Sequence, residues 1–371
     1  MTTSPDLETT LAPDPHTYAH ARRARLVERL VASKLDAALI TDPREICYLT
    51  AAPLATPSSV PSCLLVRSSG ESTLVCGETT APHHVEHLVT FPWHRGGTIF
   101  TELIPALVSH AAPKFHLENA RVGVQAESIT AQLVAGSRCT RTVPIDAILF
   151  DLERSKDELD IHRIRNAITA NLAAFEAARN TIVAGATELE VFAAATRGAM
   201  LSAGEKIVHD GDYRCNAPGG PCRNVKITSG DLYIVDAWTQ RAGYWSDLAR
   251  VYPVGPPSTE QVQLIEHVRG VHDRIRPMLR PGTTGHELWA EMDAELRRHP
   301  AIRHSGLVHH GGHGVGLRLH EVPDINPGVT DALRRGDVVC LEPGAYTSFG
   351  NVRIEETYLI TDQGAECLSG K

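Results

Sequence analysis

Four carboxylate residues lie next to strongly apolar segments in the C-terminal half of the chain. Asp236 ends the run Leu-Tyr-Ile-Val-Asp, and the chain turns at Arg241-Ala242-Gly243 before it reaches Asp247, eleven residues on. Glu342 follows Val-Val-Cys-Leu, and an excursion through two glycines returns the chain to Glu355. Each spacing predicts a hairpin with both carboxylates on one face. Because buried carboxylates are unfavourable without a cation, the four predict an oxygen-rich cation cage.

A glycine-rich segment adds histidine to this cage. His309, His310, His313 and His320 fall within twelve positions, and glycines on both sides of His313 let the backbone approach whatever the imidazole binds. One imidazole with four carboxylates is a hard donor set that suits two divalent ions. Manganese is our first choice, and cobalt, iron or zinc would also fit. Two such ions would lower the pKa of a water held between them to near neutrality.

An internal repeat explains how these residues come together. The segment 184–189 is echoed by 281–288, with an offset of 97 between Gly185 and Gly282. Each copy follows a long helix, precedes a shorter one and leads into Gly-Asp and an apolar strand. The repeat predicts two half-domains, each with two helices over antiparallel strands, packed with pseudo-twofold symmetry around one site. The alternative, four unrelated surface acids, leaves the repeat unexplained.

Capping signals place the helices of the first copy. Ser155 with Glu158 predicts a capping box at the start of a long helix that ends near Gly185. Thr187 with Glu190 predicts the start of the next helix in the same way.

The chain divides into three regions: a polar tail (1–16), a small α/β domain (17–152) and the repeat-containing domain (153–371). The small domain is expected to hold a helix over 21–33 and strands over 37–41, 62–66 and 74–77. Its densest group of ionisable residues is His83, His84 and His87, which we place on a helix. We interpret them as an exposed helix face rather than a metal site.

Composition excludes several classes of protein. The 371 residues include 36 Lys and Arg against 44 Asp and Glu, and a net charge of −8 argues against a nucleic-acid partner. No apolar run is long enough to cross a membrane, and the polar N-terminus is unlike a signal peptide. Eight scattered cysteines without a Cys-x-x-Cys pair predict free thiols. We therefore expect a cytoplasmic protein.

From about Ser155 to Asp362 the sequence resembles the pita-bread metallopeptidases, which include aminopeptidase P, prolidase, methionine aminopeptidase and the creatinases. The resemblance rests on VDAW, GYWSDLAR, GHGVGLRLHE, LEPGAY and VRIEE. Region 17–152 is similar to the N-terminal domain of the aminopeptidase P, prolidase and creatinase branch. The resemblance implies an α/β (α+β) chain with a pita-bread catalytic domain and a smaller creatinase-like N-terminal domain. It also implies a homodimer acting on a short peptide or another small molecule.

The resemblance also implies roles for particular residues. The metal ligands would be Asp236, Asp247, His313, Glu342 and Glu355, and all five are present. His309 and His320 would contact substrate or move protons, and Glu342 would also accept a proton from the bridging water. Arg353 would support a carboxylate ligand or contact a substrate carboxylate.

Three positions depart from the family pattern. Gly219 stands where a substrate-contacting histidine is usual, about seventeen residues before Asp236. Its loss argues against a metal-free creatinase mechanism and weakens the case for ordinary prolyl-peptide hydrolysis. Trp238 replaces a small residue and would reshape the substrate pocket. Arg318 replaces an acidic or neutral residue, and would either favour an anionic substrate or be a solvated strand-end cation.

These observations leave three functions open. The first is a dinuclear metallohydrolase that cleaves a C–N amide-type bond, with an Xaa-Pro dipeptide or N-terminal Xaa-Pro peptide as the first substrate to test. The second keeps the metals but predicts hydrolysis or lyase chemistry on a small non-peptide metabolite. The third is a non-catalytic binding module, which we disfavour because such modules lose ligands and this chain keeps all five. Neither a Gly-x-Ser-x-Gly elbow nor a P-loop is present.

Overall fold

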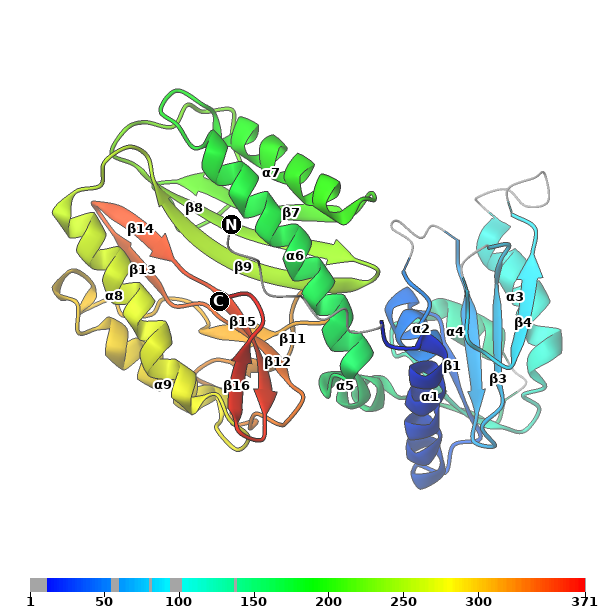
Figure 1. Cartoon of the computed structure of the whole chain (residues 1–371). Coiled ribbons are helices and arrows are strands. Elements are labelled where there is room, and N and C mark those ends of the chain that lie inside the picture. Colours follow the sequence, from blue (N-terminus) through cyan, green and yellow to red (C-terminus); the bar gives the residue numbers. More distant parts are fainter. Residues whose placement is uncertain (1–11, 55–59, 80–81, 94–101, 137–138, 371) are drawn as a thin grey trace, which may run out of the picture.

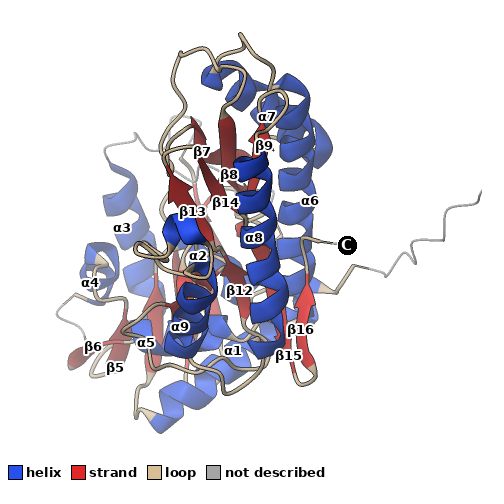
Figure 2. Cartoon of the chain, turned by 90° about the vertical axis from the view of Figure 1, so that its left-hand side faces the viewer, coloured by secondary structure: helices blue, strands red, loops and turns tan. Residues whose placement is uncertain are grey.

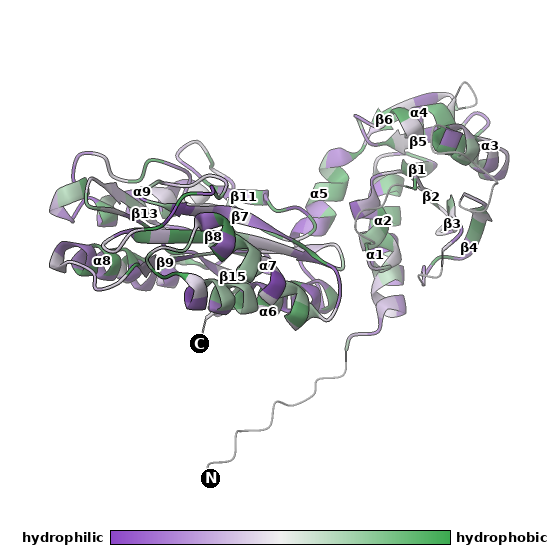
Figure 3. Ribbon diagram, turned by 90° about the horizontal axis from the view of Figure 1, so that it is seen from above, coloured by the Kyte–Doolittle hydropathy of each residue, from purple (hydrophilic) through white to green (hydrophobic). Residues whose placement is uncertain are grey.

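The computed structural model describes residues 12–54, 60–79, 82–93, 102–136 and 139–370. They form two parts that lie side by side, and α5 leads from the smaller N-terminal part into the larger one (Figures 1 and 3). No helix among the described residues has the length and apolar character that crossing a membrane requires.

The N-terminal part is a mixed six-stranded sheet in the order β4-β3-β2-β1-β5-β6, covered by helices. Its elements are α1 (Pro15–Ala32), β1 (Ala37–Ile40), α2 (Pro43–Thr50), β2 (Cys63–Arg67), β3 (Ser72–Gly77), β4 (His87–Phe91), α3 (Leu103–Phe115), β5 (Arg121–Val124), α4 (Ile129–Ala135), β6 (Arg141–Pro144) and α5 (Asp146–Arg154). The three predicted strands are confirmed as β1, β2 and β3, each within two residues.

Two predictions for this part are corrected. The first helix begins at Pro15, inside the predicted tail, because the Asp14 carboxylate accepts hydrogen bonds from the backbone amides of His16 and Thr17. His83 and His84 lie outside any helix, and His87 begins β4, so the helix expected there is wrong. Pairing with β3 holds this segment extended.

The C-terminal part contains the predicted two half-domains. The first consists of α6 (Glu158–Thr181), α7 (Glu188–Ala203), β7 (Val208–Cys215), β8 (Leu232–Arg241) and β9 (Tyr244–Pro253). The second consists of α8 (Thr259–Ile275), α9 (Gly285–Leu296), β10 (Gly312–Gly314), β11 (Glu321–Ile325), β12 (Val338–Leu341), β13 (Gly344–Thr347), β14 (Gly350–Arg353), β15 (Glu356–Thr361) and β16 (Gly364–Cys367), with short 3₁₀ helices at Arg276–Met278 and Pro300–Ile302. Helices α6 and α7 pack on β7–β9, and α8 runs beside β14 (Figures 1 and 2).

Helix caps show the repeat directly. Thr187 with Glu190 opens α7 and Thr284 with Glu287 opens α9, both as reciprocal capping boxes, and 284 − 187 reproduces the offset of 97. The capping box predicted at Ser155 is wrong by two residues. Asp157 and Asp160 form the reciprocal capping box of α6, and Ser155 is the C-cap of α5.

The two half-domains meet along their strands. The backbone N–H of Glu355 donates to the carbonyl of Ala249 over 3.0 Å, which joins the segment after β14 to β9. Strand β14 also contacts β8. The carboxylates of both halves are thereby brought to one place.

Candidate metal centre

The hairpin β8–β9 positions the first two carboxylates as the sequence predicts. In the antiparallel register Asp236 pairs with Ala249 and Trp238 pairs with Asp247, so both aspartates lie on one face. Glu342 directly follows β12, and Glu355 lies between β14 and β15. His313 stands in the middle of β10, which pairs with β12.

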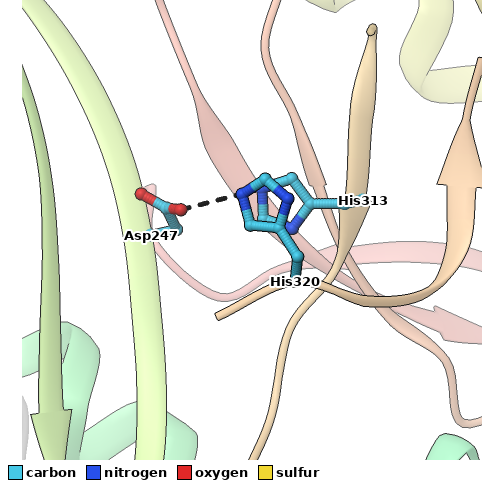
Figure 4. Close-up of side chains that lie close together, drawn as sticks. All are labelled: Asp247, His313 and His320. Atoms are coloured by element: carbon cyan, nitrogen blue, oxygen red, sulfur yellow. Dashed lines mark ion pairs between the residues drawn. The ribbon is translucent and has the colours of Figure 1, made fainter. Parts of the chain in front are cut away.

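The structure brings all five predicted ligands together. Donor atoms of Asp236, Asp247 and Glu355 lie within 4.8 Å of one another. His313 Nε2 is 3.7 Å from Asp247 Oδ2 and 3.8 Å from Glu342 Oε1. Figure 4 shows Asp247 and His313 facing each other from different strands. Each of the five residues is at most 6% exposed.

The electrostatics of this cluster fit a bound cation. Among the described residues, Asp247 Oδ1 and Glu355 Oε1 are buried and have no hydrogen-bond partner. Burial and repulsion by neighbouring carboxylates raise the pKa of both side chains well above the ordinary range. Burial raises the pKa of Asp236 to about 6, although Arg353 opposes the shift. Unpaired buried carboxylate oxygens are the donors that a divalent cation would satisfy.

His313 is held in the tautomer that a metal ligand needs. Its Nδ1–H donates to the Gly314 carbonyl over 2.9 Å, which leaves the Nε2 lone pair facing the carboxylates. Burial lowers the pKa of His313 to about 4, so the ring is neutral at physiological pH. The ring of His320 stacks on it at a centroid distance of 3.7 Å (Figure 4). A donor atom of His320 therefore also lies within reach of the Asp247 and His313 donors.

A polar network lies on one side of the cage, around Arg353, which the family resemblance expects to support a carboxylate ligand or to contact a substrate carboxylate. The Arg353 guanidinium binds Asp236 and donates through Nε and Nη2 to the Tyr346 hydroxyl over 3.0 and 2.9 Å. His309 Nδ1–H donates to the His310 carbonyl, so its Nε2 accepts from the Tyr346 hydroxyl at 2.9 Å. Burial lowers the pKa of His309 to about 4. Tyr346 lies in the LEPGAY segment, but nothing in its spacing distinguishes it there.

His310, to which the sequence gave no role, lies against Glu342. Its Nδ1 is 3.0 Å from Glu342 Oε1, and this contact raises the pKa of His310. Burial alone would raise the pKa of Glu342, but His310 and then His313 and His309 outweigh it and lower that pKa. Glu342 is therefore held as a carboxylate.

Gly219 and Trp238 border the cage. Paired residues of neighbouring strands share a face, so Trp238 lies on the same face as Asp236 and Asp247. Gly219 packs against Asp212, and a Cβ at position 219 would collide with the Asp212 carboxylate. The space that a side chain would take at this position is therefore occupied by Asp212.

Arg318 is not the solvated strand-end cation that one interpretation of the sequence gave. Its guanidinium binds Glu45 and donates to Glu153 Oε2 over 2.6 Å, and it lies 4.7 Å from the Phe150 ring. Two buried carboxylates already engage it, so an anionic substrate is not needed to balance its charge. The contact ties the segment between His313 and His320 to α2 and α5.

The contact of Arg318 with Glu45 and Glu153, here called the Arg318 junction, makes the stability of the protein depend on pH through Glu45. Glu45 is fully buried, and burial raises its pKa from 4.5 to about 7, with Asp42 adding to the shift and Arg318 opposing it. The folded state thus holds this proton more tightly than the unfolded chain, so stability falls as pH rises from about 5 through 7. We expect Glu45→Gln, which mimics the protonated form, to be on the order of 1–3 kcal/mol more stable than wild type at pH 8.

Thermal unfolding of the metal-free protein at pH 5 and pH 8 measures this effect. At pH 5 the variant and wild type should unfold at similar temperatures. Glu366→Gln, a half-exposed control on β16, should show no such difference between the two pH values. An equal loss of stability at both pH values in Glu45→Gln would contradict the prediction.

Comparisons with known proteins agree with this geometry. The model of metallopeptidase family M24 matches residues 162–362, and that of the creatinase/prolidase N-terminal domain matches residues 22–144. An Xaa-Pro dipeptidase of Pyrococcus furiosus is 33% identical over 234 residues, which are 61% of this chain and 66%, just under two thirds, of the relative. An uncharacterized peptidase of Staphylococcus saprophyticus is 25% identical over 361 residues, 93% of this chain and 98% of the relative.

Solved structures support the same fold. The prolidase from Pyrococcus furiosus superposes with a TM-score of 0.75 at 26% identity, over 93% of this chain and 99% of that one. An Xaa-Pro dipeptidase from Bacillus anthracis, at 20% identity, shows the shared fold with a TM-score of 0.77 over 95% and 98% of the two chains. With the M24 model covering more than half of its length, and with the five-residue cage in place, the chain belongs to metallopeptidase family M24 and carries the creatinase/prolidase N-terminal domain.

Proposed function

We propose that the protein is a dinuclear metallohydrolase that cleaves Xaa-Pro dipeptides or the first residue of Xaa-Pro peptides, with manganese as the preferred metal. The observation that carries this proposal is the cage of five buried donors, in which two carboxylate oxygens have no partner among the described residues. Asp236, Asp247, His313, Glu342 and Glu355 would hold the ions. When bound, such ions activate a water and polarise the scissile carbonyl.

Residues of the chain itself would transfer the proton, contact the substrate and orient the ligands. Glu342, whose pKa is lowered chiefly by its contact with His310, would accept the proton of the attacking water. His320 is exposed and stacks on His313, which suits a contact with substrate. Arg353 and Tyr346 would fix the orientations of Asp236 and His309 through the hydrogen bonds described above.

The oligomeric state and location belong to the same proposal. We propose a homodimer, on the strength of the family resemblance. We also propose a cytoplasmic location, which agrees with eight cysteines that are all free.

A second candidate is hydrolysis or lyase chemistry on a small non-peptide metabolite at the same cage. Gly219 with Asp212, and Trp238 beside the aspartates, are the observations that favour it. Robust turnover of Xaa-Pro dipeptides would eliminate it.

Metal removal tests the proposed function. We expect protein treated with a chelator to lose Xaa-Pro dipeptidase activity, and manganese to restore it at least about a hundredfold, because without the ions no residue of the cage activates water. Hydrolysis of a panel of Xaa-Pro and matched Xaa-Ala dipeptides is measured after loading with manganese, cobalt, iron or zinc. Activity that persists without metal, or no Xaa-Pro cleavage with any of the four, would overturn the proposal.

A further inference from the structure

Strand β7 presents two carboxylates beside the metal cage. Alternate residues of β7, among them Gly211 and Tyr213, are buried, whereas Asp210 and Asp212 lie on the opposite, more open face. In the register with β8, Asp212 pairs with Asp236 and Asp210 pairs with Trp238. Cross-strand partners share a face, so Asp212 and Trp238 border the same surface as the cage.

The charge of Asp212 is only partly balanced by its nearest cation. Asp212 Oδ2 is 4.0 Å from Arg353 Nη1, but the same nitrogen already binds Asp236. Two carboxylates thus share one guanidinium, and the Asp212 side chain keeps 28% of its surface exposed.

The absence of a side chain at Gly219 leaves room for the Asp212 carboxylate. Any side chain at position 219 would collide with the Asp212 carboxylate. The position at which the sequence lacks the expected histidine is therefore filled by a carboxylate from the neighbouring strand. Asp212 is the diagonal cross-strand neighbour of Trp238. A carboxylate and an indole in this arrangement can together bind an organic cation, because the indole face attracts positive charge.

We propose that Asp212 and Trp238 form a subsite that binds the positively charged side chain of the first residue of the substrate, so that the enzyme prefers Lys-Pro and Arg-Pro. This inference rests on the proposed function. Neighbouring strands lie about 4.8 Å apart, which puts Asp212 one strand beyond Asp236, on the side away from Asp247. That displacement matches the reach of a long side chain extending from a scissile bond held at the cage. The methylene stem of lysine would cover the indole while its ammonium group meets Asp212.

Binding to the metal-free protein tests the subsite without catalysis. Calorimetric titration compares Lys-Pro with norleucyl-proline, whose side chain has similar length and no charge. In wild type we expect Lys-Pro to bind roughly three- to tenfold more tightly. In Asp212→Asn the ratio of the two affinities should fall to about one, and in Trp238→Leu it should fall by roughly threefold. Glu176→Gln removes the same charge at an exposed position of α6 and should keep the wild-type ratio.

The ratio separates recognition from a structural effect. A purely structural role of Asp212 would weaken both dipeptides equally and leave the ratio unchanged, which would overturn the proposal, as would equal binding of both dipeptides to wild type. Manganese-loaded wild type should also show a lower KM for Lys-Pro than for Nε-acetyl-lysyl-proline. This comparison uses the wild-type protein alone. If no Xaa-Pro dipeptide is cleaved but the affinity ratio still depends on Asp212, the proposed function fails while the cation subsite stands.

Discussion

Replacing Asp247 with asparagine is expected to abolish metal-dependent activity and, at the same time, to stabilise the metal-free protein. Asp247 is central to the cage, since donor atoms of Asp236, Glu355 and His313 all lie close to it. Losing one ligand charge should weaken manganese binding more than about a hundredfold, beyond the effect typical of residues that only support a ligand. Xaa-Pro turnover should fall at least as far.

The opposite effect on the metal-free fold follows from burial. Repulsion and burial both disfavour the charged form of Asp247, and one of its oxygens has no partner among the described residues. Asparagine keeps the shape, removes the charge and can donate to a neighbouring carboxylate. We expect a gain of about 1–3 kcal/mol in the free energy of unfolding of the metal-free variant.

Unfolding temperatures with chelator and with manganese measure both effects together. Wild type should gain stability on metal binding, about 2.7 kcal/mol at a concentration one hundred times Kd. The variant should gain almost none. Asp362→Asn, at a position with a 74% exposed side chain, should behave as wild type. A manganese-induced rise in the variant equal to that of wild type would exclude Asp247 as a ligand.

The cage was predictable because its signals are local. The hairpin from Asp236 to Asp247 follows from two apolar strands and a glycine turn, and residues two apart on a strand share a face. The capping boxes at Thr187 and Thr284 repeat a short motif whose geometry depends on four residues. Even here the sequence leaves the start of α6 ambiguous, because Ser155 and Asp157 each have an acidic residue three positions later. In the structure Asp157 is the N-cap.

The partners of the supporting residues could not be derived from spacing or periodicity, because these contacts join distant segments. Arg318 meets Glu45 across 273 positions. Arg353 meets Asp236 across 117 positions, and support of a carboxylate ligand by Arg353 was expected from the family resemblance, not from its spacing. Tyr346 belongs to a strand that alternates like any other, and its hydroxyl acquires a role only when β14 folds back beside it. Such partners depend on how packed elements are oriented, which periodicity and composition do not encode.

Replacing Arg318 with methionine is expected to destabilise the protein by about 3–5 kcal/mol, because it leaves two buried carboxylates without their cation. Glu45 is fully buried and Glu153 is 3% exposed, and each has an oxygen with no hydrogen-bond partner in the described structure even when Arg318 is present. Burial raises the pKa of Glu153 well above its ordinary value, and Glu45 adds to this shift. Chemical unfolding at pH 8, where both acids have the greatest tendency to ionise, measures the loss.

The triple variant Arg318→Met, Glu45→Gln, Glu153→Gln separates loss of charge balance from loss of packing. Replacing a whole buried ion cluster with neutral side chains of similar volume is often close to neutral. We therefore expect the triple variant to recover most of the stability that the single variant loses, and the single variant to be less unstable at pH 5 than at pH 8. If the triple variant were as unstable as Arg318→Met, the packing of the guanidinium on Phe150, and not its charge, would hold the junction. Because Arg318 lies between His313 and His320, the single variant should also bind manganese more weakly, which links the N-terminal domain to the metal centre.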